Sequence, residues 1–392
     1  MLFLSGMATS VFYIDRQSLA VLKVHFSGLF GMTDAQYGWI VFAFMVPYTI
    51  FYLFTGYWID RFGVRKMFPV FIGGMSIAAM LTAFSQNLWQ IAASRTLLGM
   101  AEAGIVPAGV VALVKWIPNE RRSSAQSINK PLMLSGQIIA TPLTVYLTIH
   151  HGWRAAFILP GLLGIVFAIA WGFFDSADTI DAKTRVYEPA AKYISIFRQK
   201  AIWGLIIARV ITDPFWFFMV YWQPTFLQEE LGLSFEQVGR MGWIPTAVRL
   251  TAGIPLAFYI DHLIRRGKRA SRVRIRTLQI MSFGGPAMWL LMLVTNRILA
   301  IGLLSVIQIT SSTWLAFSVV LMADLVPKKM LGSAIGIMSG LGAVCSTLFT
   351  LIAGYAVHAF GYTYIFAACG LLYPIAAMIL QWYYRRDLAS SE

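Results

Sequence analysis

Apolar residues occur in twelve stretches that are long enough to cross a membrane, separated by shorter polar segments. They fall at about 1–22, 38–58, 67–86, 89–114, 125–147, 154–174, 201–227, 238–260, 275–295, 298–323, 332–356 and 363–384. A transmembrane helix needs roughly 20 predominantly apolar residues. The pattern therefore predicts an all-α polytopic membrane protein with twelve transmembrane helices.

The longest polar interval divides these stretches into six and six. We predict an N-terminal half at 1–174, a cytoplasmic linker at 175–200, and a C-terminal half at 201–392 that ends in a short cytoplasmic tail. Composition agrees with a membrane protein, because 58% of the 392 residues are hydrophobic and 12% are charged. Soluble domains carry about 25% charged residues. A water-soluble fold is excluded.

The two halves repeat one another at nearly constant offsets. Five residues recur 201 positions later: Gly31, Gln36, Gly38, Ile59 and Asp60 reappear as Gly232, Gln237, Gly239, Ile260 and Asp261. Five more recur 209 positions later: Pro118, Ser124, Ala125, Gly152 and Phe157 reappear as Pro327, Ser333, Ala334, Gly361 and Phe366. Parallel six-helix repeats are typical of major-facilitator transporters, so this fold is predicted.

Basic residues gather on one side of the predicted membrane. When residues at the ends of spans are counted with the adjoining loops, the loops that follow even-numbered spans, together with the C-terminus, hold 22 lysines and arginines, whereas the other loops hold 4. By the positive-inside rule, both termini and the linker are expected in the cytoplasm, with the protein in the plasma (inner) membrane. The net charge of +14 thus reflects topology, with anionic lipids attracted to the cytoplasmic loops. Nucleic acid is not an expected partner.

The sequence lacks the residue patterns of the common enzyme and metal sites. Its two cysteines, Cys345 and Cys369, lie in apolar runs, and four of its five histidines lie in predicted loops. No zinc-protease, serine-hydrolase or phosphate-binding motif occurs. We expect no enzyme activity, no metal and no cofactor.

The loop after the second span contains a motif with a known family pattern. It consists of Gly56, Asp60, Arg61, Gly63, Arg65 and Lys66. These residues match the major-facilitator signature G-x-x-x-D-R-x-G-x-R-[RK] at every fixed position, and the resemblance implies a gating role for the loop. In the second half Asp261 is retained, while His262 replaces Arg61. The glycines of the motif permit a tight turn between adjacent helices. The alternative is an ordinary basic hairpin.

Ionisable residues inside membrane spans are costly and are functional candidates by default. They are Asp15, Arg16, Arg95, Glu102, Lys130, Arg209, Asp213 and Arg249. Arg209 and Asp213 are four residues apart, so they are expected to pair on one helix. Lys130 either faces the transport pathway or extends to the membrane surface.

Two segments carry a closer family resemblance. They are Tyr13-Ile14-Asp15-Arg16 and Arg95-Thr-Leu-Leu-Gly99-Met-Ala-Glu102-Ala103-Gly104. With Gly152-Trp153-Arg154-Ala155-Ala156-Phe157 and Thr212-Asp213-Pro214-Phe215-Trp216, they resemble the anion:cation symporter family, especially its hexuronate and aldonate branch. The resemblance implies that Arg16 binds a substrate carboxylate, and Tyr13 of the same motif is a further substrate-binding candidate. It also implies that Asp15 and Glu102 couple protons and that Arg95 is their charge partner.

Residue chemistry agrees with those roles. A guanidinium matches the geometry of a carboxylate, and removal from water favours the protonated form of a carboxyl group. Lys130 and Arg249 add cations that the family pattern lacks. If both face the pathway, the substrate carries more than one negative charge, as an aliphatic, aromatic or sugar diacid would.

Further substrate contacts are expected from helices 5 and 7. Asn129 and Gln137 are candidates to hydrogen-bond substrate hydroxyls, or else they join helices to one another. Trp216 or Tyr221 is a candidate to close over the substrate, or else these aromatic residues provide packing alone.

The sequence therefore predicts a monomeric secondary transporter that imports a small organic anion with protons by alternating access. An exchanger or exporter of the same superfamily is the main alternative. A membrane sensor that transports nothing is disfavoured, because no segment outside the predicted spans exceeds about 26 residues.

Overall fold

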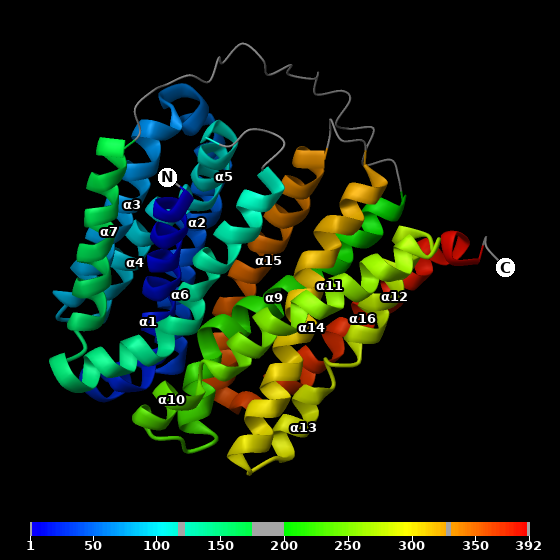
Figure 1. Ribbon diagram of the computed structural model, residues 1–392. Coiled ribbons are helices and arrows are strands. Elements are labelled where there is room, and N and C mark those ends of the chain that lie inside the picture. The colour runs from blue at the N-terminus through cyan, green and yellow to red at the C-terminus, as the bar shows by residue number, and fades with distance from the viewer. Residues whose placement is uncertain (1, 117–121, 175–199, 327–330, 390–392) are drawn as a thin grey trace. The chain divides into compact units, whose positions relative to one another are not determined.

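The computed structural model describes residues 2–116, 122–174, 200–326 and 331–389 of the chain (Figure 1). The described residues form helices joined by short turns, without strands. The chain divides into two compact units: unit 1 comprises Met1–Arg185 and Tyr221–Trp243, and unit 2 comprises Val186–Val220 and Ile244–Glu392. The two halves predicted above are divisions of the sequence, whereas units 1 and 2 are defined by packing.

Unit 1 is built mainly from the first seven helices. These are α1 (Leu2–Phe30), α2 (Asp34–Phe62), α3 (Val64–Ala83), α4 (Leu88–Glu102), α5 (Ile105–Trp116), α6 (Arg122–His151) and α7 (Ala155–Phe174). Helix α1 packs chiefly on α6, α3 on α7, and α2 on α4 (Figure 1). The end of α9 (Lys200–Glu229) and the short α10 (Phe235–Met241) also belong to this unit, where α10 packs on α6.

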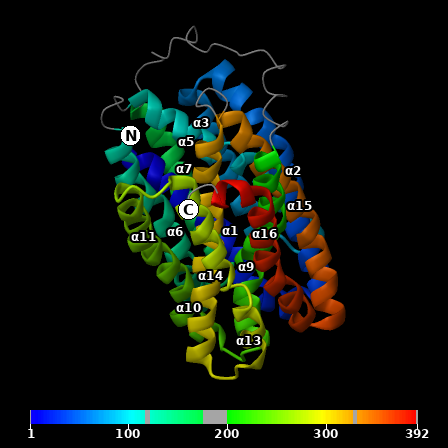
Figure 2. The ribbon, with the colours of Figure 1, turned by 90° about the vertical axis from the view of Figure 1, so that its right-hand side faces the viewer.

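Unit 2 contains the first part of α9 and the remaining helices. These are α11 (Ile244–Arg265), α12 (Ala270–Ser282), α13 (Ala287–Leu293), α14 (Arg297–Leu325), α15 (Leu331–Phe360) and α16 (Tyr362–Ala389). Helix α14 contacts α11, α12 and α13. Figure 2 shows α13 beside α14 and α15 beside α16.

Every predicted span coincides with a helix or with a helix broken into two pieces, so the predicted all-helical fold class is confirmed. The breaks lie between α4 and α5, between α10 and α11, and between α12 and α13. Each break contains a glycine (Gly104, Gly242 or Gly284), and the hydrophobic pattern runs across it without interruption. This explains why the sequence pattern predicts one span where the structure has two helices.

The repeat seen in the sequence is present in the helix ends. Thr33 and Gln36 form a capping box at the start of α2, and Ser234 and Gln237 form the same box at the start of α10. The two boxes are 201 residues apart, as are Gly31 and Gly232, which have φ angles of 65° and 59°. Glycine tolerates this left-handed conformation without steric cost. The turns are therefore repeated as well as the residues.

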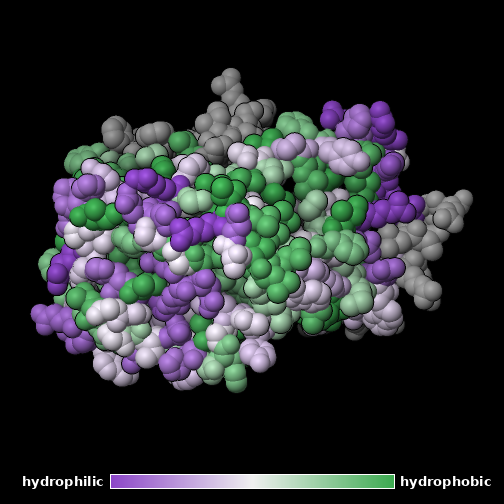
Figure 3. Space-filling model, turned by 90° about the horizontal axis from the view of Figure 1, so that it is seen from below, coloured by the Kyte–Doolittle hydropathy of each residue, from purple (hydrophilic) through white to green (hydrophobic). Residues whose placement is uncertain are grey.

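The outside of the molecule carries many apolar side chains. Phe173, Trp89 and Phe283 are 80%, 85% and 80% exposed. The view from below shows hydrophobic side chains reaching the surface among hydrophilic ones (Figure 3). Within the described residues, nine stretches are long and apolar enough to cross a membrane. Water is a poor solvent for such a surface, so the chain is an integral membrane protein.

The first helix is longer than its apolar pattern predicts. It continues to Phe30, so that Lys23 and His25, which the sequence analysis placed beyond the span, lie within α1. Lys23 is only 2% exposed. Its charge is accommodated by acidic partners, described below, which allows the helix to extend past the apolar segment.

Candidate functional site

A buried ion pair joins α1 to the end of α4. Arg16 Nη2 lies 2.9 Å from Glu102 Oε2, and Arg16 Nε lies 3.3 Å from the same oxygen. The Glu102 side chain is inaccessible to solvent, and that of Arg16 is 11% exposed. Glu102 Oε1 has no hydrogen-bond partner. The pair therefore leaves one carboxylate oxygen closed to solvent and without a hydrogen bond.

Asp15 and Arg95 extend this cluster of charges. Asp15 is fully buried, and neither of its carboxylate oxygens has a hydrogen-bond partner. Arg95 is 2% exposed, and its Nη1 donates to the backbone carbonyl oxygen of Asp15 at 3.2 Å. Its Nε and Nη2 have no hydrogen-bond partner. Buried polar atoms are normally paired, so this cluster retains unused capacity to bind a proton or an anion.

Glycines bring the α4 motif into contact with its neighbours. A methyl group at Gly99 would collide with the backbone carbonyl of Phe44 on α2, and one at Gly104 would collide with the ring of Phe71 on α3. Arg95 and Glu102 both lie on the buried face of α4, as their seven-residue spacing predicts. The motif thus places two charged side chains on one face and makes close helix packing possible beside them.

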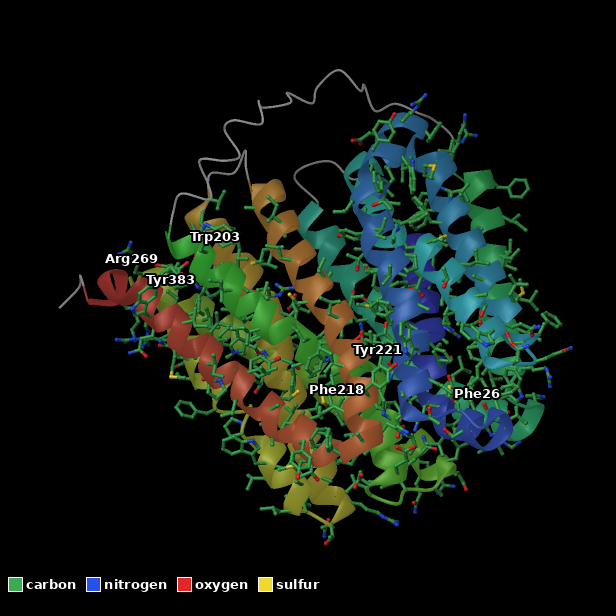
Figure 4. All side chains as sticks on the ribbon, turned by 180° about the vertical axis from the view of Figure 1, so that it is seen from behind. Phe26, Trp203, Phe218, Tyr221, Arg269 and Tyr383 are labelled. Atoms are coloured by element: carbon green, nitrogen blue, oxygen red, sulfur yellow. The ribbon has the colours of Figure 1, made fainter. Side chains whose placement is uncertain are left out.

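An aromatic cluster supports Arg95 from the other side. Its guanidinium carbon lies 5.0 Å from the ring centre of Phe157, a cation–π distance. Phe26 of α1, labelled in Figure 4, contacts Trp153 edge to face at 5.0 Å. Trp153 and Phe157 belong to the Gly-Trp-Arg-Ala-Ala-Phe segment identified in the sequence. That segment therefore contributes the surface on which Arg95 rests.

A small cavity adjoins the charged cluster. It measures about 10 Å³, close to the space for one water molecule. Its lining residues are Arg16, Leu19, Val41, Phe44, Arg95 and Tyr221. Tyr221 points from α9 toward α2 (Figure 4), and its hydroxyl contacts Met45 Sδ at 3.7 Å. A cavity of this size is too small to hold an organic acid.

Hydrogen bonds and ion pairs hold the end of α9 against α1 and α2 within unit 1. The Tyr37 hydroxyl donates to the backbone oxygen of Tyr221 at 2.8 Å. Lys23 forms ion pairs with Asp34 and with Glu229. These contacts fix the position of Tyr221 over the cavity.

Unit 2 contains a second buried ion pair, and it confirms the predicted pairing on helix 7. Arg209 and Asp213 form an i, i+4 ion pair on α9. Arg209 also donates to Ser318 Oγ at 2.8 Å and to the Leu315 carbonyl at 3.3 Å. A methyl group at Gly342 would collide with the Asp213 carboxylate. The pair is thus enclosed by α14 and α15.

Arg249 is a further buried cation of unit 2. It is 6% exposed, and its guanidinium carbon lies 4.6 Å from the ring centre of Trp216. Both residues were substrate candidates, and the structure brings them together across α9 and α11. Trp216 thus stacks on Arg249 within this unit.

The sequence of residues 5–339 matches the profile of the Major Facilitator Superfamily. The chain belongs to this superfamily. Its relatives include the hexuronate transporter of Escherichia coli (strain K12), 26% identical over 97% of this chain and 92% of the relative. The D-galactonate transporter of Escherichia coli O6:H1 is 24% identical over 89% and 87% of the two chains. These names agree with the predicted resemblance to organic-acid transporters.

Solved structures confirm the facilitator fold. The D-xylose–proton symporter superposes with a TM-score of 0.78 at 13% identity, over 97% of this chain and 96% of the other. A bacterial homologue of the human lysosomal transporter Spinster, inward-facing and occupied, gives 0.74 at 16% identity, over 99% and 92%. At these identities the likeness concerns the fold alone.

Four further residues of this facilitator that were predicted to bind substrate lie on α1 and α6. Tyr13 and Gln137 are half-buried in unit 1. Asn129 and Lys130 lie on α6, but their side chains fall outside the described part of the structure. In the described ranges, no group of three His, Cys, Asp or Glu side chains is placed to hold a metal ion.

The signature loop of the facilitator lies at the junction of α2 and α3. Gly63, with φ 80°, ends α2 and begins α3, as expected of a turn glycine. Gly56 is different, because it lies inside α2 with open space where a Cβ would be, so the prediction that it permits the turn is wrong. Arg61 Nη1 donates to the Tyr57 hydroxyl at 2.6 Å. Asp60, Arg65, Lys66 and Asp261 are exposed.

Sequence reasoning missed the rings around Arg16 and the contacts of Lys23. Phe12, Tyr48 and Phe44 have ring centres 4.5, 4.9 and 5.1 Å from the Arg16 guanidinium carbon. Phe12 precedes Arg16 by four residues, a helical spacing that was visible in the sequence. The positions of Phe44 and Tyr48 depend on packing between helices, which no local pattern reveals.

Proposed function

We propose that this protein is a secondary active transporter that imports a small organic carboxylate together with protons by alternating access. The observation that carries the proposal is the buried Arg16–Glu102 ion pair beside Asp15 and a cavity. The guanidinium is the natural partner of a substrate carboxylate. In the closed site it is held by an acid of the protein instead.

Competition for Arg16 supplies a mechanism of coupling. When Glu102 takes up a proton, it loses its charge and its attraction to Arg16 falls. The guanidinium is then free to bind a substrate carboxylate. Release of the proton restores the ion pair and displaces the substrate. Asp15, buried and without hydrogen bonds to its carboxylate, is proposed as the second protonation site. Arg95 limits the cost of burying these acids through its positive charge.

The proposed orientation in the membrane follows from the distribution of lysines and arginines among the loops. Both termini and the 175–200 linker are assigned to the cytoplasmic side of the inner membrane, because the basic residues gather in the loops on that side. The exposed Arg65 and Lys66 are placed there by the same argument. Anionic lipid headgroups would bind such residues. Substrate and protons would then enter from the opposite side.

The proposed substrate is an organic acid. This class is supported by relatives named as hexuronate, D-galactonate and galactarate/D-glucarate transporters. These relatives are 22–26% identical to this chain, so transport measurements on this protein decide which acid it carries.

Uptake into proteoliposomes tests the proposal. Labelled D-glucuronate, D-galactonate and phthalate would be offered with and without a pH gradient, alkaline inside. We expect at least one acid to accumulate against its gradient only when the pH gradient is present. Exchange of internal for external acid without any response to the pH gradient would identify an anion exchanger. No movement of any carboxylate would reject the proposal.

A further inference from the structure

Three aromatic rings surround the proposed carboxylate-binding arginine. Phe12, Tyr48 and Phe44 lie 4.5 to 5.1 Å from the guanidinium carbon of Arg16. Phe44 and Tyr48 are one helical turn apart on α2, and their rings stack at 5.7 Å with an interplanar angle of 22°. Aromatic faces attract a guanidinium and hold it in place. A flat aromatic wall therefore adjoins the group that would bind the carboxylate.

Among the described residues, Phe44 is the one of these three rings that lines the cavity, and the remaining wall is largely apolar. Apart from the two arginines, the described lining residues are Leu19, Val41, Phe44 and Tyr221. Of these four, only Tyr221 has a side-chain polar group, and its hydroxyl already contacts Met45 Sδ. Leu19 and Val41 are 3% and 0% exposed. This wall would contact the body of a bound acid. Partners for its hydroxyl groups are confined to the charged end of the site, at the unpaired atoms of Asp15, Arg95 and Glu102.

The chemistry of this wall distinguishes between classes of carboxylate. A sugar acid carries a hydroxyl on nearly every carbon, and a buried hydroxyl without a partner is strongly unfavourable. An aromatic ring has no such requirement. It also gains by stacking against other rings. Carboxylate binding by Arg16 is common to both classes, so the wall and not the arginine decides between them.

We infer that the site in unit 1 selects a carboxylate with an aromatic body, bound through Arg16 with its ring against Phe44 and Tyr48, over a polyhydroxylated acid. The inference rests on the proposed function, since it names the substrate class of the same site. It assigns Phe44 and Tyr48 as specificity-determining residues. Both lie on α2, so the selection is made within one packed unit.

Three acids of similar size test the inference: benzoate, cyclohexanecarboxylate and D-glucuronate. Each has one carboxylate on a six-membered ring, and they differ in aromaticity and hydroxyl content. Binding to the purified protein in detergent is measured by calorimetry and thermal shift, because neutral benzoic acid crosses bilayers unaided. We expect the lowest Kd for benzoate, a higher one for cyclohexanecarboxylate and the highest for D-glucuronate.

Variants separate the ring contribution from general packing. Phe44→Leu and Tyr48→Leu should each raise the Kd of benzoate by about two- to tenfold, the value of an aromatic pair, and leave that of cyclohexanecarboxylate nearly unchanged. Tyr48→Phe keeps the ring, so it should raise the Kd of benzoate less than Tyr48→Leu does. Phe54→Leu, on the same helix but 51% exposed, is the matched control and should bind all three acids unchanged.

The failure of the inference and that of the proposed function give different results. If D-glucuronate binds more tightly than benzoate, and Phe44→Leu affects the acids equally, the aromatic selection is wrong while carboxylate binding stands. If none of the three acids, nor D-galactonate or phthalate, binds to the wild-type protein, then the carboxylate site itself is rejected.

Discussion

The guanidinium of Arg16 and the carboxylate of Glu102 form an ion pair with a 2.9 Å separation between Nη2 and Oε2, and the Glu102 side chain is closed to solvent. Removing one partner of a buried pair leaves an uncompensated charge. Loss of charge on Glu102 by protonation therefore changes what Arg16 can bind. This competition is the physical basis of the proposed coupling.

Glu102→Gln should abolish uptake driven by a pH gradient while preserving exchange of internal for external substrate. The glutamine is a permanent analogue of the protonated acid, so Arg16 stays available to substrate but no proton is taken up or released. Both activities are measured in proteoliposomes with the acid that the wild-type protein transports. Glu236→Gln serves as the control, because Glu236 is exposed and pairs with Arg240 on the surface. Gradient-driven uptake by Glu102→Gln at the wild-type rate would remove Glu102 from the coupling.

Arg16→Lys should raise the Kd for carboxylate substrate by about 10- to 100-fold, the value of one to two charge-assisted hydrogen bonds. Lysine keeps the charge but lacks the planar fork of donors. Calorimetry on the purified protein gives the Kd directly. The matched substitution Arg240→Lys, at a 76% exposed side chain, should leave it unchanged. Equal affinity in the Arg16→Lys and Arg240→Lys proteins would place the substrate elsewhere.

Most of the fold could be predicted from the sequence, because twelve apolar stretches and a repeated turn pattern are local properties. The helix breaks could not, since the apolar pattern continues through Gly104, Gly242 and Gly284. Arg16 and Glu102 were identified as candidates from their cost in a membrane. Their direct pairing depends on how α1 and α4 are arranged in space. The two residues are 86 positions apart in the sequence, so no local pattern reveals the contact.

Lys23→Met should destabilise the protein by about 1–3 kcal/mol, the cost of leaving buried or half-buried partners unsatisfied. Lys23 is 2% exposed and pairs with both Asp34 and Glu229. Its loss leaves two carboxylates facing one another. The apparent melting temperature in detergent should therefore fall.

The double variant Lys23→Met/Glu229→Gln tests that explanation, because it removes one of the two repelling charges. Its melting temperature should lie above that of Lys23→Met alone. If the effects of Lys23→Met and Glu229→Gln on the melting temperature simply add in the double variant, the two residues do not interact. Their ion pair then contributes nothing to stability.

Gly99→Ala should lower stability by about 1–3 kcal/mol, as overpacking does. The added methyl would collide with the backbone carbonyl of Phe44, which cannot move without shifting α2. Gly73→Ala on α3 is the comparison, since its methyl would find only Ala168 at 3.9 Å. That substitution should be neutral or stabilising, because alanine favours the helix. Identical melting curves for the two variants would show that α2 and α4 do not pack closely at Gly99.

Proton-coupled carboxylate uptake is tested most directly by measuring proton entry and carboxylate uptake simultaneously in one proteoliposome preparation. An internal pH-sensitive dye reports the protons, and labelled phthalate and D-glucuronate report the anion. Adding the transported acid outside should acidify the interior in the wild-type protein, whereas Glu102→Gln should show no acidification. Uptake of either acid by the wild-type protein without any accompanying proton entry would contradict proton coupling.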